Sequence, residues 1–549
     1  MVSFSACIFF VCEKDLNMQR GGPLRIIKYP SEQSVFYMKK ALMIVGTSSY
    51  AGKTLIAAAL CRIFRDDGYR VAPFKAQNMA LNSFVTKEGG EIGRAQALQA
   101  EAAGIEPSVD MNPILLKASG EDGCQVIVSG RVHSNMKATE YYAFKKEAWM
   151  AVTQAYERLS KRHDLIIIEG AGSPAEINLR DDEVVNMRVA RHTNAPVILV
   201  GDIDKGGVFA SFYGTIGLLD GDADYIKAFL INKFRGDLSI LRPGLKMIHE
   251  KTGRPVIGVI PHLGDLRLHE EDGIPSERLS GSKVQRFKDS KIKIVVLRLR
   301  YIANFTDFDP FLYEPDVEMV YSLWEGDIEN ADLVIIPGSK NTVKDLLFLR
   351  ESGIEGEMKQ AAKKGTPLMG ICGGYQMLGN KIYDPHGVES DLEEMDGLGL
   401  LDIESTFQRT KLTSQVEAEL DNNGMFNAEF SIPDCGLKGY EIHMGVSKGD
   451  IGLFRLKRIS SDSGSRMLNS ELILDGSVKD NVWGTYIHGI FDNDRFRRTL
   501  LNSLRVRKGL RPIEEVVNYS GLREDALNKW ARTLKENTDM KFIEGLISG

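Results

Sequence analysis

A cysteine in the second half of the chain has the surroundings of a catalytic nucleophile. Cys372 lies in GICGG, residues 370–374, after an apolar run that predicts a strand and before a segment that predicts a helix. A nucleophile on such a strand-to-helix turn is exposed, and the following helix N-terminus favours the reactive thiolate. The backbone N–H of Gly373 is then a natural oxyanion donor, and Gly338 in IIPGSKNT is the second candidate.

Two histidines could act as the base for this thiol. His488, in TYIHGIF, follows a later apolar strand and is the favoured base, while His443, in GYEIHMG, competes with it. A lone histidine is more often structural, so the prediction depends on its pairing with Cys372. A degenerate, inactive domain remains the alternative.

A second set of residues predicts a phosphate site near the start of the chain. The segment GTSSYAGKT, residues 46–54, lies between an apolar strand and an amphipathic helix, as a P-loop requires. Its spacing has five residues, rather than four, between the first glycine and Gly-Lys-Thr. We expect Lys53 to reach the β- and γ-phosphates of ATP and the Thr54 hydroxyl to bind Mg²⁺. The expected phosphate-binding residues are Gly46, Thr47, Ser48, Gly52, Lys53 and Thr54.

Charged residues at other strand ends could complete this nucleotide site. Glu169 ends the strand DLIIIEG and could bind Mg²⁺, and Lys75 in APFKAQNM could neutralise a transferring phosphoryl group. Asp202 and Asp204, in GDIDKGG, also follow a strand, where open α/β sheets bind ligands. The alternatives are a strand-end acid for Glu169, a solvated lysine for Lys75 and helix caps for the two aspartates.

The elements that must position these residues alternate between strands and helices. Strands are predicted at 41–46, 164–170, 195–201 and 255–261, then at 293–299, 331–338, 366–374 and 482–489. Helices are predicted at 54–65, 208–219 and through most of 495–549. This alternation predicts two doubly wound α/β domains with parallel sheets. We expect a P-loop domain at 38–275, a linker at 276–290, a Cys–His domain at 291–500 and a helical segment at 501–549.

Composition excludes several other classes of protein. A length of 549 residues, 43% hydrophobic and 26% charged, is ordinary for a multidomain globular protein. The net charge of −6 gives no reason to expect nucleic acid, and no run is long enough for a membrane span. Six cysteines without paired spacing fit a reducing, cytoplasmic setting, and no obligate protein partner is evident. Residues 1–37 are interpreted as a non-core extension. A signal peptide is the alternative, and it is disfavoured because no Lys or Arg precedes the apolar run at residues 3–12.

The motifs together carry a family resemblance over the chain from about Met38 to its end. GICGGYQMLG and YIHGIF resemble a class I glutamine amidotransferase domain, and GTSSYAGKT resembles the dethiobiotin synthetase-like P-loop group. With FKAQNMALNS, DIDKGGVFAS, PGSKNT and GYEIHMG, the chain resembles the cobyric acid synthase family. The resemblance implies ATP- and glutamine-dependent amidation of the b, d, e and g carboxylates of adenosylcobyrinic acid a,c-diamide, in cobalamin biosynthesis. It also implies that Cys372 is the glutaminase nucleophile and His488 its base.

One position departs from the wider amidotransferase pattern. Ile490 stands where a glutamate, two residues after the histidine, usually orients the imidazole. Asp492 and Glu441 are weak candidates for the missing partner, and we expect slow glutamine hydrolysis unless the synthetase site is occupied. Cobyrinic acid a,c-diamide synthase and a MinD-type regulatory ATPase are the alternative functions. Position alone suggests that the corrinoid contacts Gln77, Asn78 and Asn82.

Overall fold

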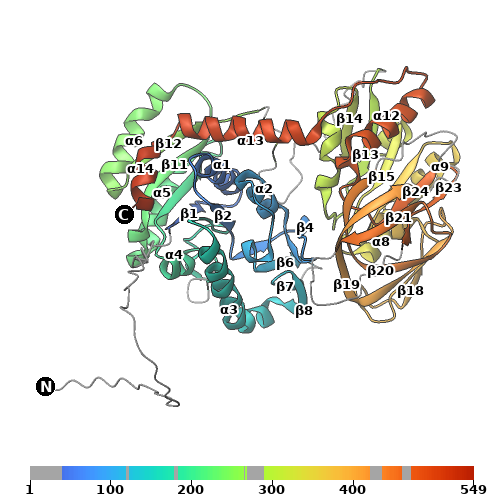
Figure 1. The fold of residues 1–549 in the computed structure, drawn as a ribbon, viewed down its shortest axis with the longest axis horizontal. Coiled ribbons are helices and arrows are strands. Elements are labelled where there is room, and N and C mark those ends of the chain that lie inside the picture. The colour runs from blue at the N-terminus through green and yellow to red at the C-terminus, as the bar shows by residue number, and fades with distance from the viewer. Residues whose placement is uncertain are drawn as a thin grey trace, which may run out of the picture. The chain divides into compact units, whose positions relative to one another are not determined.

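The first half of the chain is built on a parallel six-stranded sheet with helices on both faces (Figure 1). The computed structural model describes residues 40–118, 123–178, 183–264, 266, 268, 290–420, 436–459 and 472–548. Alternate residues of the central strands enter two separate apolar clusters, one on each face, so both faces are covered. In spatial order the strands are β12 (Val256–Pro261), β11 (Ile226–Phe234), β10 (Val197–Asp202), β1 (Lys40–Gly46), β9 (Leu165–Glu169) and β2 (Val71–Phe74). The helices are α1 (Lys53–Asp66), α2 (Arg94–Ala103), α3 (Ala138–Arg162), α4 (Met187–Thr193), α5 (Val208–Leu218) and α6 (Leu238–Thr252).

Two small sheets are inserted between β2 and β9, which are neighbours in the main sheet. The first orders β3 (Gln77–Met79), β6 (Ile114–Ala118), β7 (Gly123–Val128) and β8 (Arg131–Lys137). The second is a hairpin of β4 (Ser83–Val85) and β5 (Glu91–Gly93), and β5 leads directly into α2. These short strands have too little periodicity for sequence patterns to predict.

The second half repeats the doubly wound plan around another six-stranded sheet. Five strands are parallel and only β23 pairs antiparallel to its neighbour β24. In spatial order the strands are β14 (Val317–Ser322), β13 (Ile292–Leu297), β15 (Leu333–Ile336), β16 (Leu368–Ile371), β24 (Val482–Thr485) and β23 (Ser477–Lys479). The helices are η5 (Phe305–Tyr313, a 3-10 helix), α7 (Glu325–Glu329), α8 (Thr342–Glu351), α9 (Ile354–Lys363), α10 (Gly373–Leu378) and α12 (Asp494–Arg507). The predicted fold class, two doubly wound α/β parts, is confirmed.

A mostly antiparallel sheet is inserted between β16 and β24 in the chain. Its longest strands, β19 (Ile403–Leu420) and β20 (Leu437–Gly449), pair along most of their lengths. The other members are β17 (Lys381–Tyr383), β18 (Glu394–Asp396), β21 (Phe454–Ile459) and β22 (Ile473–Asp475). The sheet places Glu441 and His443 of β20 near Cys372, because Ile442 between them contacts the thiol.

The C-terminal helices return to the first half. α13 (Tyr519–Glu536) packs on α1, and the indole N–H of Trp530 donates to Leu55 O at 2.7 Å. Trp530 and Ile543 of α14 (Met540–Ser548) join the apolar cluster of the first sheet, and Figure 1 shows both helices in red beside the earlier elements. α13 and α14 therefore complete a core whose first members, Leu42 and Ile44, lie in β1 near the start of the described chain.

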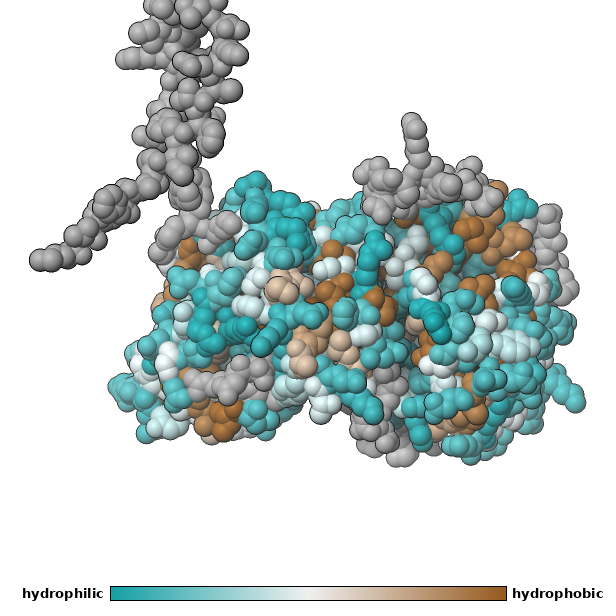
Figure 2. Space-filling view, turned by 90° about the horizontal axis from the view of Figure 1, so that it is seen from below, coloured by the Kyte–Doolittle hydropathy of each residue, from teal (hydrophilic) through white to brown (hydrophobic). Residues whose placement is uncertain are grey.

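Several of the predicted domain boundaries fall on residues that the structure does not describe. Residues 39–549 cluster as one compact unit, and α12 runs through the predicted boundary at residue 500. The predicted extension, 1–37, lies outside the described residues, as does the predicted linker except for residue 290. No helix in the described ranges is both long and apolar enough to cross a membrane. Figure 2 shows apolar residues set among polar ones on one face of the molecule.

Candidate active sites

Cys372 occupies a strained turn between β16 and α10. Its φ of 51° and ψ of −107° are unusual for a non-glycine residue, as expected for a nucleophile on a sharp elbow. Glycines surround it because the backbone is crowded: a Cβ on Gly374 would lie 2.0 Å from Ile336 O, and one on Gly370 would lie 2.6 Å from the Gly374 carbonyl carbon. The thiol lies 3.6 Å from Ile442 O. The GICGG motif is thus a steric requirement of this turn.

His488 follows β24 and is bound to a carboxylate that sequence analysis did not find. His488 Nδ1 lies 2.6 Å from Asp307 Oδ2, and the other oxygen of Asp307 accepts the Gly489 N–H at 3.1 Å. His488 and Asp307 are 1% and 4% exposed. Among the described residues His488 Nε2 makes no hydrogen bond of standard geometry, while the Cys372 side chain acts on the same imidazole. This nitrogen is therefore placed to exchange a proton with the thiol or with a substrate.

Asp307 changes the protonation of His488. Burial lowers the pKa of this imidazole, but the charge of Asp307 and its hydrogen bond outweigh burial, and Cys372 adds a smaller contribution. The resulting pKa of His488 is about 10. Near neutral pH the ring is therefore an imidazolium, which stabilises a thiolate and can protonate a leaving amine.

The sequence left the carboxylate partner of His488 unidentified, and Asp307 occupies that position in the structure. Asp307 supplies it from η5, far from the position after the histidine where Ile490 stands. Neither weak candidate fills the role: Glu441 accepts from Arg458 at 2.6 Å and lies beside His443, while Asp492 lies 4.0 Å from Arg94. His488 therefore has the carboxylate partner that a good base requires, and the reason given for expecting slow glutamine hydrolysis no longer applies.

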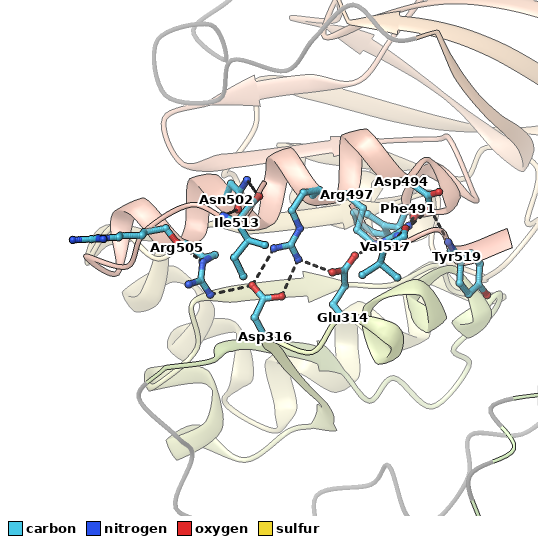
Figure 3. Close-up of polar contacts among 12 residues, drawn as sticks. Glu314, Asp316, Phe491, Asp494, Arg497, Asn502, Arg505, Ile513, Val517 and Tyr519 are labelled. Atoms are coloured by element: carbon cyan, nitrogen blue, oxygen red, sulfur yellow. Dashed lines mark hydrogen bonds and ion pairs between the residues drawn. The ribbon is translucent and has the colours of Figure 1, made fainter. Parts of the chain in front are cut away.

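The end of η5 is fixed by a buried network of charges (Figure 3). Glu314, directly after η5, accepts from Arg497 at 2.7 Å and from Arg498 at 2.6 Å, both on α12. Arg498 and Arg505 also bind Asp316. The side chains of Glu314 and Arg497 are fully buried, so removing either partner would leave an uncompensated charge. This network fixes η5, and with it Asp307, against α12.

The two predicted oxyanion donors lie near the catalytic pair. A Cβ on Gly338 would lie 3.2 Å from His488 Cε1, so this glycine backbone passes directly beside the imidazole. Gly338 lines the same small cavity as Cys372 and His488, and that cavity also includes Lys117 and Gln125 from the first half. His443 lines it too, but its Nδ1 lies 2.6 Å from Gly445 O and its ring stacks on Tyr486. His443 is thus less available as a base than His488.

The predicted phosphate loop ends at the N-terminus of α1. Gly52 has a φ of +94°, which requires glycine, and Lys53 Nζ donates to Ser48 O at 2.9 Å across the loop. A Cβ on Gly46 would meet Ser48 O at 2.9 Å and Lys53 Nζ at 3.0 Å. The predicted Gly46–Thr54 segment therefore forms a tight loop ahead of a helix, as phosphate binding requires.

Glu169 is the centre of the polar contacts beside this loop. Its Oε1 accepts from Thr54 Oγ1 and from Lys75 Nζ, both at 2.8 Å, and its Oε2 accepts from Gln99 at 2.6 Å. Burial alone would raise the pKa of Glu169, but the charges of Lys75 and Lys53 lower it below its ordinary range. A hydroxyl and a carboxylate side by side are the hard oxygen ligands that Mg²⁺ prefers, so this pair fits the ion.

Other predictions for the first half have mixed outcomes. Lys75 is buried in its ion pair with Glu169, which contradicts a solvated lysine. Asp202 Oδ1 accepts the backbone N–H of Asp204 and so shapes the turn after β10. Sequence analysis missed the strand β11, whose Asn232 donates to Ala51 O in the loop at 3.0 Å.

The three residues suggested for corrinoid contact are already engaged in the structure. Gln77 accepts from the Tyr141 hydroxyl, and Asn78 donates to Gln96 at 3.2 Å. Asn82 is 2% exposed and accepts the backbone N–H of Phe305. The Asn82 side chain therefore lies at an internal contact.

Comparison with known proteins identifies both halves. Residues 42–275 match the CobQ/CobB/MinD/ParA nucleotide binding domain, and residues 293–496 match the CobB/CobQ-like glutamine amidotransferase domain. Over 506 residues the chain is 50% identical to the cobyric acid synthase of Thermodesulfovibrio yellowstonii, covering 92% of this chain and 99% of that one. The chain belongs to the cobyric acid synthase family.

Further members of the cobyric acid synthase family match over the same span. The enzyme of Thermoanaerobacter sp. (strain X514) is 47% identical over 511 residues, covering 92% of this chain and 98% of its own. The predicted family, a glutamine-dependent amidoligase with a nucleotide-binding domain, is confirmed. Neither alternative function is favoured by these full-length matches.

Proposed function

We propose that this chain converts adenosylcobyrinic acid a,c-diamide to adenosylcobyric acid by amidating its b, d, e and g carboxylates with nitrogen from glutamine. The observation that carries the proposal is the joint presence, in one chain, of a loop suited to ATP and a buried Cys372–His488–Asp307 set. A cobyric acid synthase, by its name, makes the product of this reaction, and the relatives with that name match 92% of the chain.

In the second half, the Cys372 thiolate attacks the side-chain amide carbon of glutamine. The oxyanion that forms takes hydrogen bonds from the backbones of Gly373 and Gly338. His488 gives its proton to the departing nitrogen, so ammonia leaves and a thioester remains on Cys372. Water, deprotonated by the now neutral His488, hydrolyses the thioester to glutamate and restores the thiolate. Asp307 keeps the imidazole oriented and stabilises its charged form.

In the first half, a corrinoid carboxylate oxygen attacks the γ-phosphorus of ATP and ADP leaves. Gly46, Thr47, Ser48, Gly52, Lys53 and Thr54 bind the phosphates. Thr54 and Glu169 would hold Mg²⁺, which would neutralise phosphate charge during the transfer. Lys75, next to Glu169, adds positive charge at the same place. Ammonia then attacks the acyl phosphate, phosphate leaves, and an amide remains.

The experiment that tests this function counts amides by mass. Purified protein is incubated with ATP, Mg²⁺, glutamine and adenosylcobyrinic acid a,c-diamide, and in a parallel arm with cobyrinic acid. We expect four amides on the first substrate and none at the a and c positions of the second. Amidation confined to the a and c carboxylates would support cobyrinic acid a,c-diamide synthase instead. If neither corrinoid is amidated with glutamine or with ammonia, the proposal is refuted.

A further inference from the structure

A hairpin of the nucleotide-binding half packs against the elements that hold His488. The Tyr440 hydroxyl donates to Ser83 O, at the start of β4, at 3.2 Å. The Tyr440 ring stacks on the His488 imidazole, with centroids 5.3 Å apart and planes 18° apart. Val85 of the same hairpin forms a small apolar cluster with Tyr440 and Ile442, and Ile442 contacts the Cys372 thiol. The hairpin therefore touches neighbours of both catalytic side chains.

Asn82 and Asn304 form a reciprocal pair of hydrogen bonds across this contact, each to the backbone N–H of the residue that follows the other asparagine. The side-chain oxygen of Asn82 accepts the Phe305 N–H at 3.0 Å, and that of Asn304 accepts the Ser83 N–H at 2.8 Å. Both asparagines are 2% exposed, so water cannot readily replace either bond. The pair fixes the register of the first half against residues 304–305 of the second.

Residues 304–305 are also the entry to η5, which carries Asp307. Asn304 has a φ of +53°, its carbonyl accepts the Asp307 N–H at 3.0 Å, and its side-chain nitrogen lies 3.4 Å from His488 Nδ1. A shift of this loop would therefore move Asp307 relative to the imidazole. The two buried bonds from residues 82–83 reach this loop from the other half.

The backbone carbonyl of Asn82 connects the same segment to α2, which contacts the nucleotide site. Its carbonyl accepts the N–H of Arg94, the first residue of α2, at 3.2 Å. One turn further along α2, Gln96 and Gln99 donate to Glu169, which accepts from Thr54. Asn82 thus lies between the loop suited to ATP and the loop that carries Asp307.

From these contacts we infer that Asn82 is a positioning residue for glutamine hydrolysis, contributed by the half that does not contain Cys372. Its side chain, together with Asn304, fixes the loop that aligns Asp307 with His488. The inference rests on the proposed glutaminase role of Cys372. It predicts that the catalytic set is complete only when the two halves are docked.

The test compares two variants that break the contact from opposite sides in the full-length protein. Asn82→Ala removes the acceptor for Phe305, and Asn304→Gly removes the other side chain while tolerating the positive φ. We measure glutamate release from glutamine, alkylation of Cys372 by iodoacetamide as a function of pH, and amidation with free ammonia.

Both variants should lower kcat for glutamine hydrolysis about tenfold with little change in KM. The alkaline limit of activity should move down by about one pH unit, because a loosened Asp307 stabilises the imidazolium less. Amidation with free ammonia should stay within about twofold of the wild-type rate, because it does not use His488.

Gln415→Ala is the matched control. Gln415 donates to Val85 O at 3.0 Å across the same interface, and none of the described hydrogen bonds joins its side chain to residues 304–307 or to the catalytic pair. Wild-type kcat and an unshifted pH limit are expected for this variant. The inference is overturned if Asn82→Ala and Asn304→Gly keep both wild-type properties, or if Gln415→Ala loses them equally. Failure of the wild type to amidate the corrinoid would instead refute the proposed function, and glutamine hydrolysis would still decide the role of Asn82.

Discussion

The two sites differ in how their residues are distributed along the chain. The phosphate loop is one continuous segment, residues 46–54, and its flanking strand and helix are its immediate neighbours. The residues of the Cys–His site instead come from four separate segments of the second half: Asp307 lies in η5, and Gly338, Cys372 and His488 follow β15, β16 and β24. A local site can be identified from spacing, whereas a dispersed site also depends on docking contacts that no motif contains.

The largest expected effect separates the two sites completely. Cys372→Ala should lower glutamine-dependent amidation about 10⁴-fold or more, because no other group can form the thioester. Amidation with free ammonia should remain, because the phosphate loop is untouched. Both rates are measured by product mass. Loss of the ammonia-dependent rate in a folded variant would show that the two sites are not separable.

Asp307→Asn tests whether the dispersed carboxylate matters. We expect glutamine hydrolysis to fall about 10²–10⁴-fold, because the imidazole loses its charge partner and its orientation. The pKa of His488, about 10 beside Asp307, should fall toward its ordinary value near 6.5. The imidazolium is present only below that pKa, so the alkaline limit of activity should move to lower pH. Rates from pH 5 to 10.5 measure this, and an unchanged limit would contradict the assignment of Asp307.

Lys53→Ala gives the complementary result at the local site. Amidation should fall about 10²–10³-fold with either nitrogen source, because charge on the transferring phosphoryl group is no longer neutralised. Basal glutamine hydrolysis should remain measurable. Equal retention of both amidation rates would contradict phosphate binding by this loop.

The smallest effect on chemistry is expected from the charge network behind η5. Glu314→Gln should lower the free energy of unfolding by about 3 kcal/mol, because Arg497 stays buried with fewer partners. Glutamine hydrolysis should fall less than tenfold. Urea denaturation measures the first effect. Glu329→Gln, at an exposed pair with Lys364, is the control and should change stability by less than about 0.5 kcal/mol.

Sequence patterns predicted most strands of the two main sheets, though not β11, because parallel strands buried on both faces are continuous apolar runs. They also predicted the phosphate loop and the cysteine turn, whose glycines are required by close backbone contacts. The β19–β20 hairpin was missed because its burial alternates irregularly along each strand. Asp307 was missed because it lies in a 3-10 helix with no spacing relation to Cys372. The sequence signal that could have indicated Asp307 is the pair of acidic residues within the apolar run NFTDFDPF, because a buried carboxylate needs a polar or charged partner.

The most direct test of the central claim, that the two sites act as one enzyme, follows the nitrogen atom. The protein is supplied with amide-¹⁵N glutamine, ATP, Mg²⁺ and adenosylcobyrinic acid a,c-diamide in the presence of unlabelled ammonium, and the product is analysed by mass spectrometry. We predict four new amides that retain the ¹⁵N label, because ammonia passes from Cys372 to the acyl phosphate without mixing with the solvent. A product whose label is diluted to that of the bulk ammonium would contradict the claim.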